Sequence, residues 1–256
     1  MDYQGRGVPL DDSGMDQVCA ALGVADAEVW AVLTVETRGF GFLADRRPQI
    51  LFERHVFHRL TKGKFDAGNA DISNVTPGGY IGGAGEYDRL AKAIALDKAN
   101  ALQSASWGIG QVMGFNFKTA GYASSDKFVA GMVKDENSQL LAMANFIKEN
   151  GLAAALQRKN WVSFARGYNG PDFKRNEYDT RLAAAHARFQ VLLPDLQLRT
   201  AQAALKYLGF NPGPIDGIRG RQTTSALTGF QHGEGLPESG LLDQDTFARL
   251  QAKAFP

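Results

Sequence analysis

The sequence has little cysteine, no excess of charge of either sign and no long apolar run. Its 256 residues include one cysteine, Cys19, which excludes an internal disulfide framework and a multi-cysteine metal site. The 28 basic and 27 acidic side chains nearly cancel, which argues against a general nucleic-acid-binding protein and against a disordered acidic tail. No apolar stretch approaches the roughly 20 residues of a membrane span. We therefore expect a soluble globular protein without nucleic acid or a stable membrane association.

The N-terminal residues also lack the basic and then apolar pattern of a secretory signal. This indicates a protein that is made in the cytoplasm and has no signal peptide. Two histidines, His55 and His58, could share a helix face, but no third ligand has a convincing spacing for zinc. We expect a monomer that needs no metal or cofactor.

Ala, Leu, Glu, Lys and Gln cluster in long stretches, and alternating runs of β-branched residues are scarce. This composition predicts a mainly α protein. A short strand is predicted over 49–52 and a long ordered loop over 67–85, a length that is often functional. Helices are predicted over 12–22, 26–37, 87–102, 125–134, 136–150, 160–168 and 174–193.

The best domain boundary lies at residues 193–195, Leu-Pro-Asp. We expect one domain over 1–193 and a small three-helix domain over 196–256. The helices of the small domain are predicted over 200–208, 221–231 and 244–253. Because the linker is short, we expect the two domains to dock rather than to swing freely.

Glu36 is the first candidate catalytic residue. It lies in the last turn of a predicted helix, where the negative end of the helix dipole disfavours a second negative charge. Trp30, Leu33, Phe40 and Phe42 could also remove water from it. Both effects would raise its pKa, as a general acid requires. The alternatives are a solvated glutamate at a helix end, or an ion-pair partner of Arg38.

Glu53 is the second candidate, because it ends the short predicted strand and precedes Arg54 and His55, which could keep it ionised. A protonated carboxyl opposite an ionised one is the usual arrangement for glycoside hydrolysis. The alternative is a salt bridge with Arg54 or Arg59.

Two further segments could line a groove. In residues 104–114, glycines allow close backbone approach to a ligand, Trp107 offers a flat face to a sugar, and Gln111 offers a donor and an acceptor. In residues 166–171, Tyr168 and Asn169 end a helix beside a glycine and a proline. The alternatives are a tight turn with a core tryptophan and a plain helix C-cap.

These strings, in this order, closely resemble the phage endolysin N-acetylmuramidase domain, which is related to goose-type lysozymes and lytic transglycosylases. The resemblance covers about residues 20–190 and rests on residues 35–42, 47–55, 104–114 with Asn116, and 164–170. It implies a lysozyme-like, mainly α-helical domain that hydrolyses the β-1,4 bond between N-acetylmuramic acid and N-acetylglucosamine in peptidoglycan. Within it Glu36 would be the general acid and Glu53 the second carboxylate. The residues that would line the saccharide cleft are Ser106, Trp107, Gln111, Tyr168 and Asn169.

Residues 196–256 resemble the three-helix peptidoglycan-binding module of wall hydrolases, on strings that include 202–206, 208–210 and 214–217. The wall-binding residues implied are Asp216, Phe230 and Gln231. The resemblance therefore implies a modular endolysin that binds and degrades peptidoglycan and lyses the host cell. It would stay in the cytoplasm of the bacterial host until a separate pore-forming protein gives it access to the wall.

Two other functions are weighed against the muramidase. A lytic transglycosylase cleaves the same bond without water, leaves a 1,6-anhydro product and can act with one glutamate. The presence of Glu53 favours hydrolysis. A wall-binding protein with an inactive catalytic domain is the alternative from another class.

Overall fold

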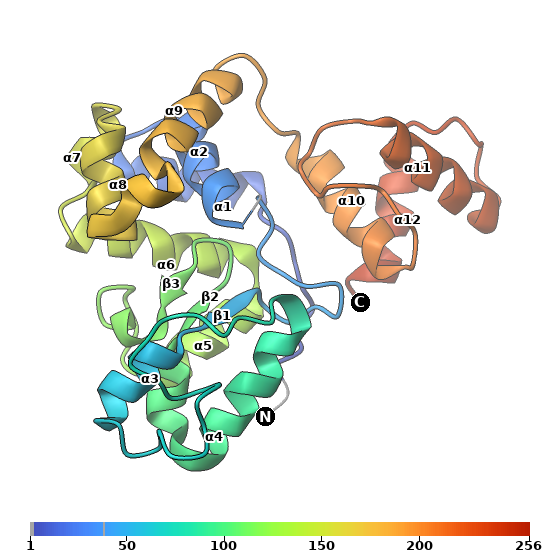
Figure 1. Ribbon diagram of the computed structural model, residues 1–256. Coiled ribbons are helices and arrows are strands. Elements are labelled where there is room, and N and C mark those ends of the chain that lie inside the picture. Colours follow the sequence, from blue (N-terminus) through green and yellow to red (C-terminus); the bar gives the residue numbers. More distant parts are fainter. Residues whose placement is uncertain (1–2, 38) are drawn as a thin grey trace.

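A computed structural model describes residues 3–37 and 39–256, and it is mainly helical, as predicted. The chain forms a larger N-terminal domain with a small sheet and a C-terminal domain of three helices beside it (Figure 1). Across the described ranges no single helix is long and apolar enough to cross a membrane. Helices α1 and α2 pass that test only together, as a pair bent by 104°.

The helices of the N-terminal domain begin where the sequence supplies caps. Asp11, Ser124, Asp135 and Asn160 each accept a hydrogen bond from a backbone N–H in the first turn of the helix that follows. The helices are α1 (Asp12–Leu22), α2 (Asp26–Thr37), α3 (Arg54–Thr61), α4 (Glu86–Gln103), α5 (Ser125–Lys134), α6 (Glu136–Glu149), α7 (Ala153–Gln157), α8 (Trp161–Asn169) and α9 (Tyr178–Phe189).

In the N-terminal domain the structure differs from the prediction at three helices, of which α9 differs at both ends and stops at Phe189 rather than at 193. Helices α3 and α7 were not predicted, and α9 begins at Tyr178 rather than at 174. The 3₁₀ turn Pro171–Asn176 takes that place, and Glu177 has a left-handed φ of 51°, which separates the turn from α9. Two other short 3₁₀ turns span Gly83–Gly85 and Gly114–Asn116.

A three-stranded antiparallel sheet lies at the centre of the N-terminal domain. Its order is β1 (Ile50–Phe52), β2 (Ala105–Trp107), β3 (Val112–Met113), with Phe52 opposite Ala105 and Trp107 opposite Val112. The predicted strand over 49–52 is confirmed as β1. The sheet places the end of β1 next to the hairpin formed by β2 and β3.

Helix α2 is buried on almost every side, which explains its apolar sequence. Val29, Val32 and Leu33 are at most 1% exposed, and Trp30 packs at 6.2 Å from the ring of Phe189 in α9. A helix that is apolar all round is a core helix. The C-terminal end of α2 is therefore held in place by packing on several sides of the helix.

The C-terminal domain consists of α10 (Leu196–Tyr207), α11 (Arg221–Glu234) and α12 (Gln244–Ala254). Helix α10 begins four residues earlier than predicted because Asp195 caps it, accepting a hydrogen bond of 2.9 Å from the N–H of Leu198. The domain has its own small core around Leu205, Leu227 and Leu250.

The two domains are docked, as the short linker predicted. Phe40 and Phe42 of the N-terminal domain pack against Ala203 of α10. Arg46 stacks over the ring of Tyr207 at 4.4 Å, and its Nη1 donates to the Ala254 carbonyl at 2.6 Å. Phe40 and Phe42 therefore form part of the interface between the two domains, although the sequence suggested that they surround Glu36.

Candidate active site

Glu36 lies in the last turn of α2, and its side chain is partly exposed. The Nδ2 of Asn169, at the end of α8, donates a 2.8 Å hydrogen bond to Glu36 Oε1. Removal of water by the surrounding protein raises the pKa of Glu36 to about 7, against the opposing influence of Asn169 and Arg181. The predicted direction of the pKa shift is confirmed. Glu36 can thus carry a proton near neutral pH.

The charged and aromatic groups that face Glu36 come from α8 and α9. Arg181 of α9 donates to the Val35 carbonyl at 3.2 Å, which places its positive charge near the end of α2. The charge of Glu36 contributes to raising the pKa of Tyr168 and Tyr178, so both phenols lie close to it. Arg38, the ion-pair partner weighed from the sequence, lies outside the described residues.

Glu53 is the residue that joins β1 to α3, and its side chain is 16% exposed. The hydroxyl of Tyr80 donates to both carboxylate oxygens, at 3.0 and 2.9 Å, and His55 Nδ1 lies 3.1 Å from Oε2. Arg54 is directed elsewhere and donates to the carbonyls of Ala70, Thr76 and Pro77. The polar partners of Glu53 are therefore Tyr80 and His55 rather than the predicted arginines.

Tyr80 was not predicted as a site residue. It comes from the long loop over 67–85, 27 residues away from Glu53 in sequence. The length and glycine content of that loop indicated a functional segment, but nothing in it singled out Tyr80. Burial and the neighbouring charge of Glu53 raise the pKa of Tyr80 to about 12, so its hydroxyl remains a donor at neutral pH.

The hairpin of β2 and β3 connects the two glutamates through its turn, residues 108–111. Thr37, next to Glu36, donates to the Ile109 carbonyl at 2.9 Å, and Tyr168 donates to the Gly110 carbonyl at 2.6 Å. Because β1 pairs with β2, the same hairpin also adjoins Glu53. The turn therefore fixes α2, α8 and β1 relative to one another.

Three predictions within this hairpin are modified by the structure. Trp107 is 0% exposed and donates to the Leu102 carbonyl at 3.1 Å, so the prediction that it contacts a sugar is wrong and it is a core residue. Ser106 is 6% exposed and donates to Gln111 Oε1 at 2.7 Å. Added Cβ atoms at Gly108 and Gly110 would meet α6 at 2.7 Å, so these glycines allow close approach to a helix rather than to a ligand.

Gln111 has a left-handed φ of 47° and uses its amide within the protein. Its Nε2 donates to the Gly108 carbonyl at 2.9 Å, while Oε1 accepts from Ser106. It therefore stabilises the turn, and its contact with saccharide stays a prediction, as do those of Tyr168 and Asn169.

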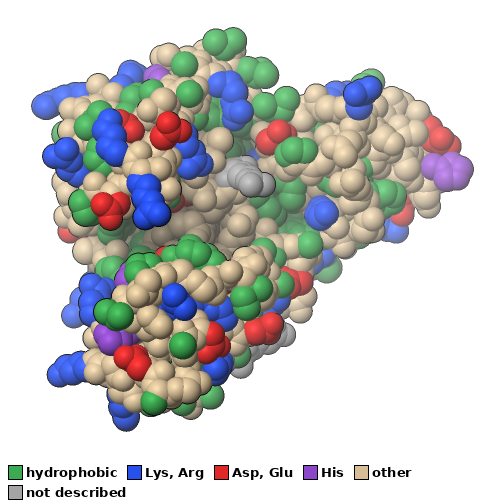
Figure 2. All heavy atoms as spheres, in the orientation of Figure 1, with side chains coloured by type: hydrophobic (Ala, Val, Ile, Leu, Met, Phe, Trp, Pro, Cys, Tyr) green, Lys and Arg blue, Asp and Glu red, His purple; other side chains and the backbone are tan. Residues whose placement is uncertain are grey.

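The surface is hollowed between the lobe of α2, α8 and α9 and the lobe of α3 and α4 (Figure 2). A pocket of about 310 Å³ beside Glu53 is lined by His55, Val56, Arg59, Met113 and Phe115. Within residues 3–37 and 39–256, no group of three or more His, Cys, Asp or Glu side chains could hold a metal ion. The N-terminal domain thus offers two carboxyl groups in different surroundings, Glu53 beside this pocket and Glu36 in the last turn of α2.

Residues 25–190, more than half of the chain, match the N-acetylmuramidase family. The chain belongs to this family. Residues 195–250 match a second family, described as a putative peptidoglycan-binding domain.

A solved structure similar to this chain is the crystal structure of Burkholderia AP3 phage endolysin. It is 39% identical, with a TM-score of 0.65, and the match covers 74% of this chain and 72% of that one. No curated protein matches the sequence. Together, the two domains and this likeness identify a peptidoglycan-degrading endolysin, with peptidoglycan as its substrate or partner.

The structure of the C-terminal domain corrects two predicted wall contacts. Phe230 is 2% exposed and Gln231 is 0% exposed, so neither side chain can reach a glycan. Gln231 instead joins the end of α11 to the next loop, accepting from the Gly240 N–H at 2.9 Å and donating to the Leu241 carbonyl at 2.9 Å. Both were implied only by the resemblance to the peptidoglycan-binding module, and a matching string does not tell a packing residue from a binding residue.

The third predicted wall contact, Asp216, faces the N-terminal domain. It lines an interdomain pocket of about 250 Å³ together with Trp30 and Phe189. Its carboxylate accepts from the Ile218 N–H at 3.0 Å and so also shapes its own loop. Wall binding by Asp216 stays a prediction.

The raised pKa of Glu36 predicts how activity depends on pH. Glu36 is protonated below about pH 7 and loses its proton above it. A mechanism with one essential acid then loses about tenfold in kcat/KM for each pH unit above that point. Initial rates of peptidoglycan solubilisation between pH 5 and 9, at constant ionic strength, measure this fall in activity, the alkaline limb of the pH profile. A rate that stays constant up to pH 8.5 would contradict it.

Proposed function

We propose that this protein is a lysozyme, an N-acetylmuramidase that hydrolyses the β-1,4 bond between N-acetylmuramic acid and N-acetylglucosamine. The observation that carries the proposal is the contrast between its two carboxyl groups. Removal of water favours the protonated form of Glu36, whereas Glu53 accepts from the Tyr80 hydroxyl and lies beside His55. A pair of carboxyl groups in contrasting environments is the arrangement that glycoside hydrolysis uses.

In the proposed reaction Glu36 is the general acid. Asn169 donates to Oε1, which leaves Oε2 to carry the proton toward the leaving glycosidic oxygen. As that oxygen takes the proton, the bond to the anomeric carbon breaks and positive charge develops on the sugar ring. The carboxylate of Glu53 either activates a water molecule or stabilises this positive charge.

The orientation of Glu53 is supported by groups from two segments. Tyr80 donates to both of its oxygens from the loop, and the N–H of Glu53 donates to the Ser104 carbonyl at 2.8 Å. A second carboxylate that is held in this way suits hydrolysis, whereas a lytic transglycosylase needs only Glu36.

Mass spectrometry of the soluble products tests the bond and the reaction together. Purified peptidoglycan is digested with the wild type and with Glu53→Gln, and the products are reduced with borohydride. Reduced muramic acid ends from the wild type, with a loss of about 100-fold or more for Glu53→Gln, are expected. Anhydro-muramic ends, or near-wild-type activity of Glu53→Gln, would instead indicate a lytic transglycosylase. Reduced glucosamine ends would show that the other glycosidic bond is cleaved.

We also propose the cellular setting. The protein acts as a monomer that accumulates in the cytoplasm of the bacterial host and reaches the wall after the membrane has been breached. The likeness to a phage endolysin supports this setting. Fractionation of producing cells, with and without a co-expressed pore-forming protein, tests it. Lysis should occur only when both proteins are present.

A further inference from the structure

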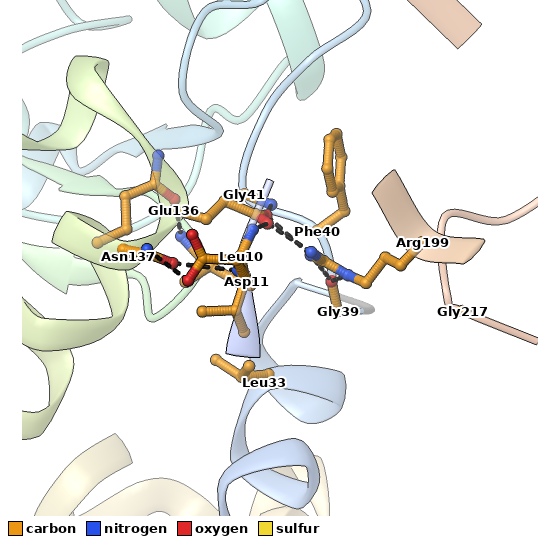
Figure 3. A network of polar contacts seen from close by, with 12 residues as sticks. Leu10, Asp11, Leu33, Gly39, Phe40, Gly41, Glu136, Asn137, Arg199 and Gly217 are labelled. Carbon is orange, nitrogen blue, oxygen red and sulfur yellow. Dashed lines mark hydrogen bonds and ion pairs between the residues drawn. The ribbon is translucent and has the colours of Figure 1, made fainter. Parts of the chain in front are cut away.

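A buried ion pair joins the two domains beside the segment that follows the helix of Glu36. Arg199 of α10 and Glu136, the first residue of α6, are both 0% exposed. Arg199 Nη1 donates to Glu136 Oε2 at 2.6 Å, and Nη2 donates to Oε1 at 2.9 Å (Figure 3). The two planar groups therefore meet in the bidentate geometry that gives the strongest hydrogen bonds of this kind.

The same arginine also binds the backbone just after α2. Its Nε donates to the Gly39 carbonyl at 3.1 Å, and Nη2 donates to that carbonyl as well. Its guanidinium carbon lies 5.2 Å from the ring centre of Phe40 and 5.5 Å from that of Trp30. One side chain of the C-terminal domain therefore contacts α2 itself and the segment that follows it.

Gly39 determines where α2 ends. Its N–H donates to the Leu33 carbonyl at 3.2 Å, and its φ of 86° turns the chain out of the helix. Glu36 lies in the turn that this bond closes. The group that Arg199 holds is thus three residues from the proposed general acid.

Glu136 restrains the segment from the other side. Its Oε1 accepts from the Gly41 N–H at 2.7 Å, and its Oε2 accepts from the Leu10 N–H at 2.7 Å. Phe40 and Phe42 pack on Ala203 of α10 nearby. Residues 39–42 are therefore fixed jointly by α6 and by the C-terminal domain.

We propose that Arg199 is a positioning residue for catalysis, through which the C-terminal domain fixes the end of α2 and hence the carboxyl group of Glu36. The inference rests on the proposed role of Glu36 as general acid. A catalytic group must be held to within a fraction of an ångström, and small displacements cost large factors in rate. The C-terminal domain then contributes to turnover in addition to binding the wall.

The pH dependence reports whether Glu36 has moved. The groups that face it, Asn169 and Tyr168 of α8 and Tyr178 and Arg181 of α9, remain when Arg199 is replaced. If the end of α2 loosens, water reaches Glu36 and the protonated form is less favoured. The alkaline limb of activity should then move to lower pH.

The experiment uses the full chain with Arg199→Lys and Arg199→Met, assayed on soluble peptidoglycan fragments well below the unfolding temperature of each variant. We expect kcat to fall about 10- to 100-fold while KM changes little, because the substrate groove keeps its residues. We expect the alkaline limb to shift to lower pH. Lysine keeps the charge but cannot bind Glu136 and Gly39 together, so this variant decides the question if Arg199→Met does not fold.

A matched control removes stability from the C-terminal domain without touching the interface. Leu227→Ala opens the core of that domain. It should keep the wild-type kcat and alkaline limb, and all folded variants should sediment with intact sacculi as the wild type does.

The inference is overturned if folded Arg199→Lys keeps the wild-type kcat and alkaline limb, or if Leu227→Ala reproduces the loss. The proposed function itself would be contradicted by a separate result, the activity of Glu36→Gln. If Glu36→Gln keeps full activity, Glu36 is not the general acid, whatever Arg199 does.

Discussion

Glu36→Gln is expected to lower peptidoglycan cleavage at least about 100-fold, because general acid catalysis contributes about 10²–10⁴ in rate. Glutamine keeps the size of the side chain and can still bond to Asn169, but it has no proton to give to the leaving oxygen. Release of soluble fragments from sacculi, followed at pH 6, measures the loss. Binding of the variant to sacculi should equal that of the wild type, because the C-terminal domain is unchanged.

A matched control for Glu36→Gln is Glu149→Gln. Glu149 is also a glutamate in the last turn of a helix, α6, but it is exposed and distant in sequence from the site. We expect it to keep full activity. Residual cleavage above about one tenth of the wild-type rate in Glu36→Gln would contradict the role of Glu36.

Glu36→Gln should also stabilise the protein at alkaline pH. The pKa of Glu36 rises from 4.5 to about 7 on folding, so the folded state binds its proton more tightly than the unfolded chain does. The wild type therefore loses stability relative to Glu36→Gln as the pH rises from about 4.5 to 7. Urea unfolding at pH 8 should show a gain of about 1–2 kcal/mol for the variant, allowing for solvent screening. At pH 4 the difference should vanish.

Glu136→Gln is expected to lower the free energy of unfolding by about 3–5 kcal/mol, because it leaves the buried Arg199 without a counter-charge. Glu136 and Arg199 are both 0% exposed, and Glu136 also accepts from the backbone of Leu10 and Gly41. Urea unfolding at pH 7 measures the change. A loss below about 1 kcal/mol would show that water reaches the pair.

Two further variants separate the buried charge from other causes. The double variant Glu136→Leu with Arg199→Met removes both charges and should recover part of the lost stability. Glu238→Gln breaks the pair with His232, in which both side chains are more than half exposed, and should leave the free energy of unfolding nearly unchanged.

Local signals explain which parts of the fold could be predicted. The bounds of α1 and α2 were predicted correctly, because caps such as Asp11 and stops such as Gly23 and Gly39 act within a few residues. Helix α3 was missed, because its N-cap residue is Glu53, whose side chain accepts from Tyr80 instead of capping the helix. The side chain at the N-cap of α3 therefore gives no local signal for the start of that helix.

Glu36 and Glu53 were singled out because each is set in a distinctive local string, and their catalytic roles stay predictions. The structure places Asn169 against Glu36. Trp107 and Phe230 were misassigned, because an aromatic residue next to a glycine or an amide has the same sequence pattern whether it lines a groove or fills a core. Burial depends on what packs against a residue, and a local window does not contain that information.

The sequence by itself determined the mainly helical architecture and the family, and it singled out Glu36 and Glu53 as candidates, since these depend on short-range patterns and on motifs in a fixed order. Only the tertiary structure decided the surroundings of those glutamates. Tyr80 reaches Glu53 across 27 residues, and Arg199 reaches Glu136 across 63. Such contacts arise when whole elements pack together, so no local pattern specifies them. The docking of the C-terminal domain against the end of α2 likewise depends on how whole elements pack together.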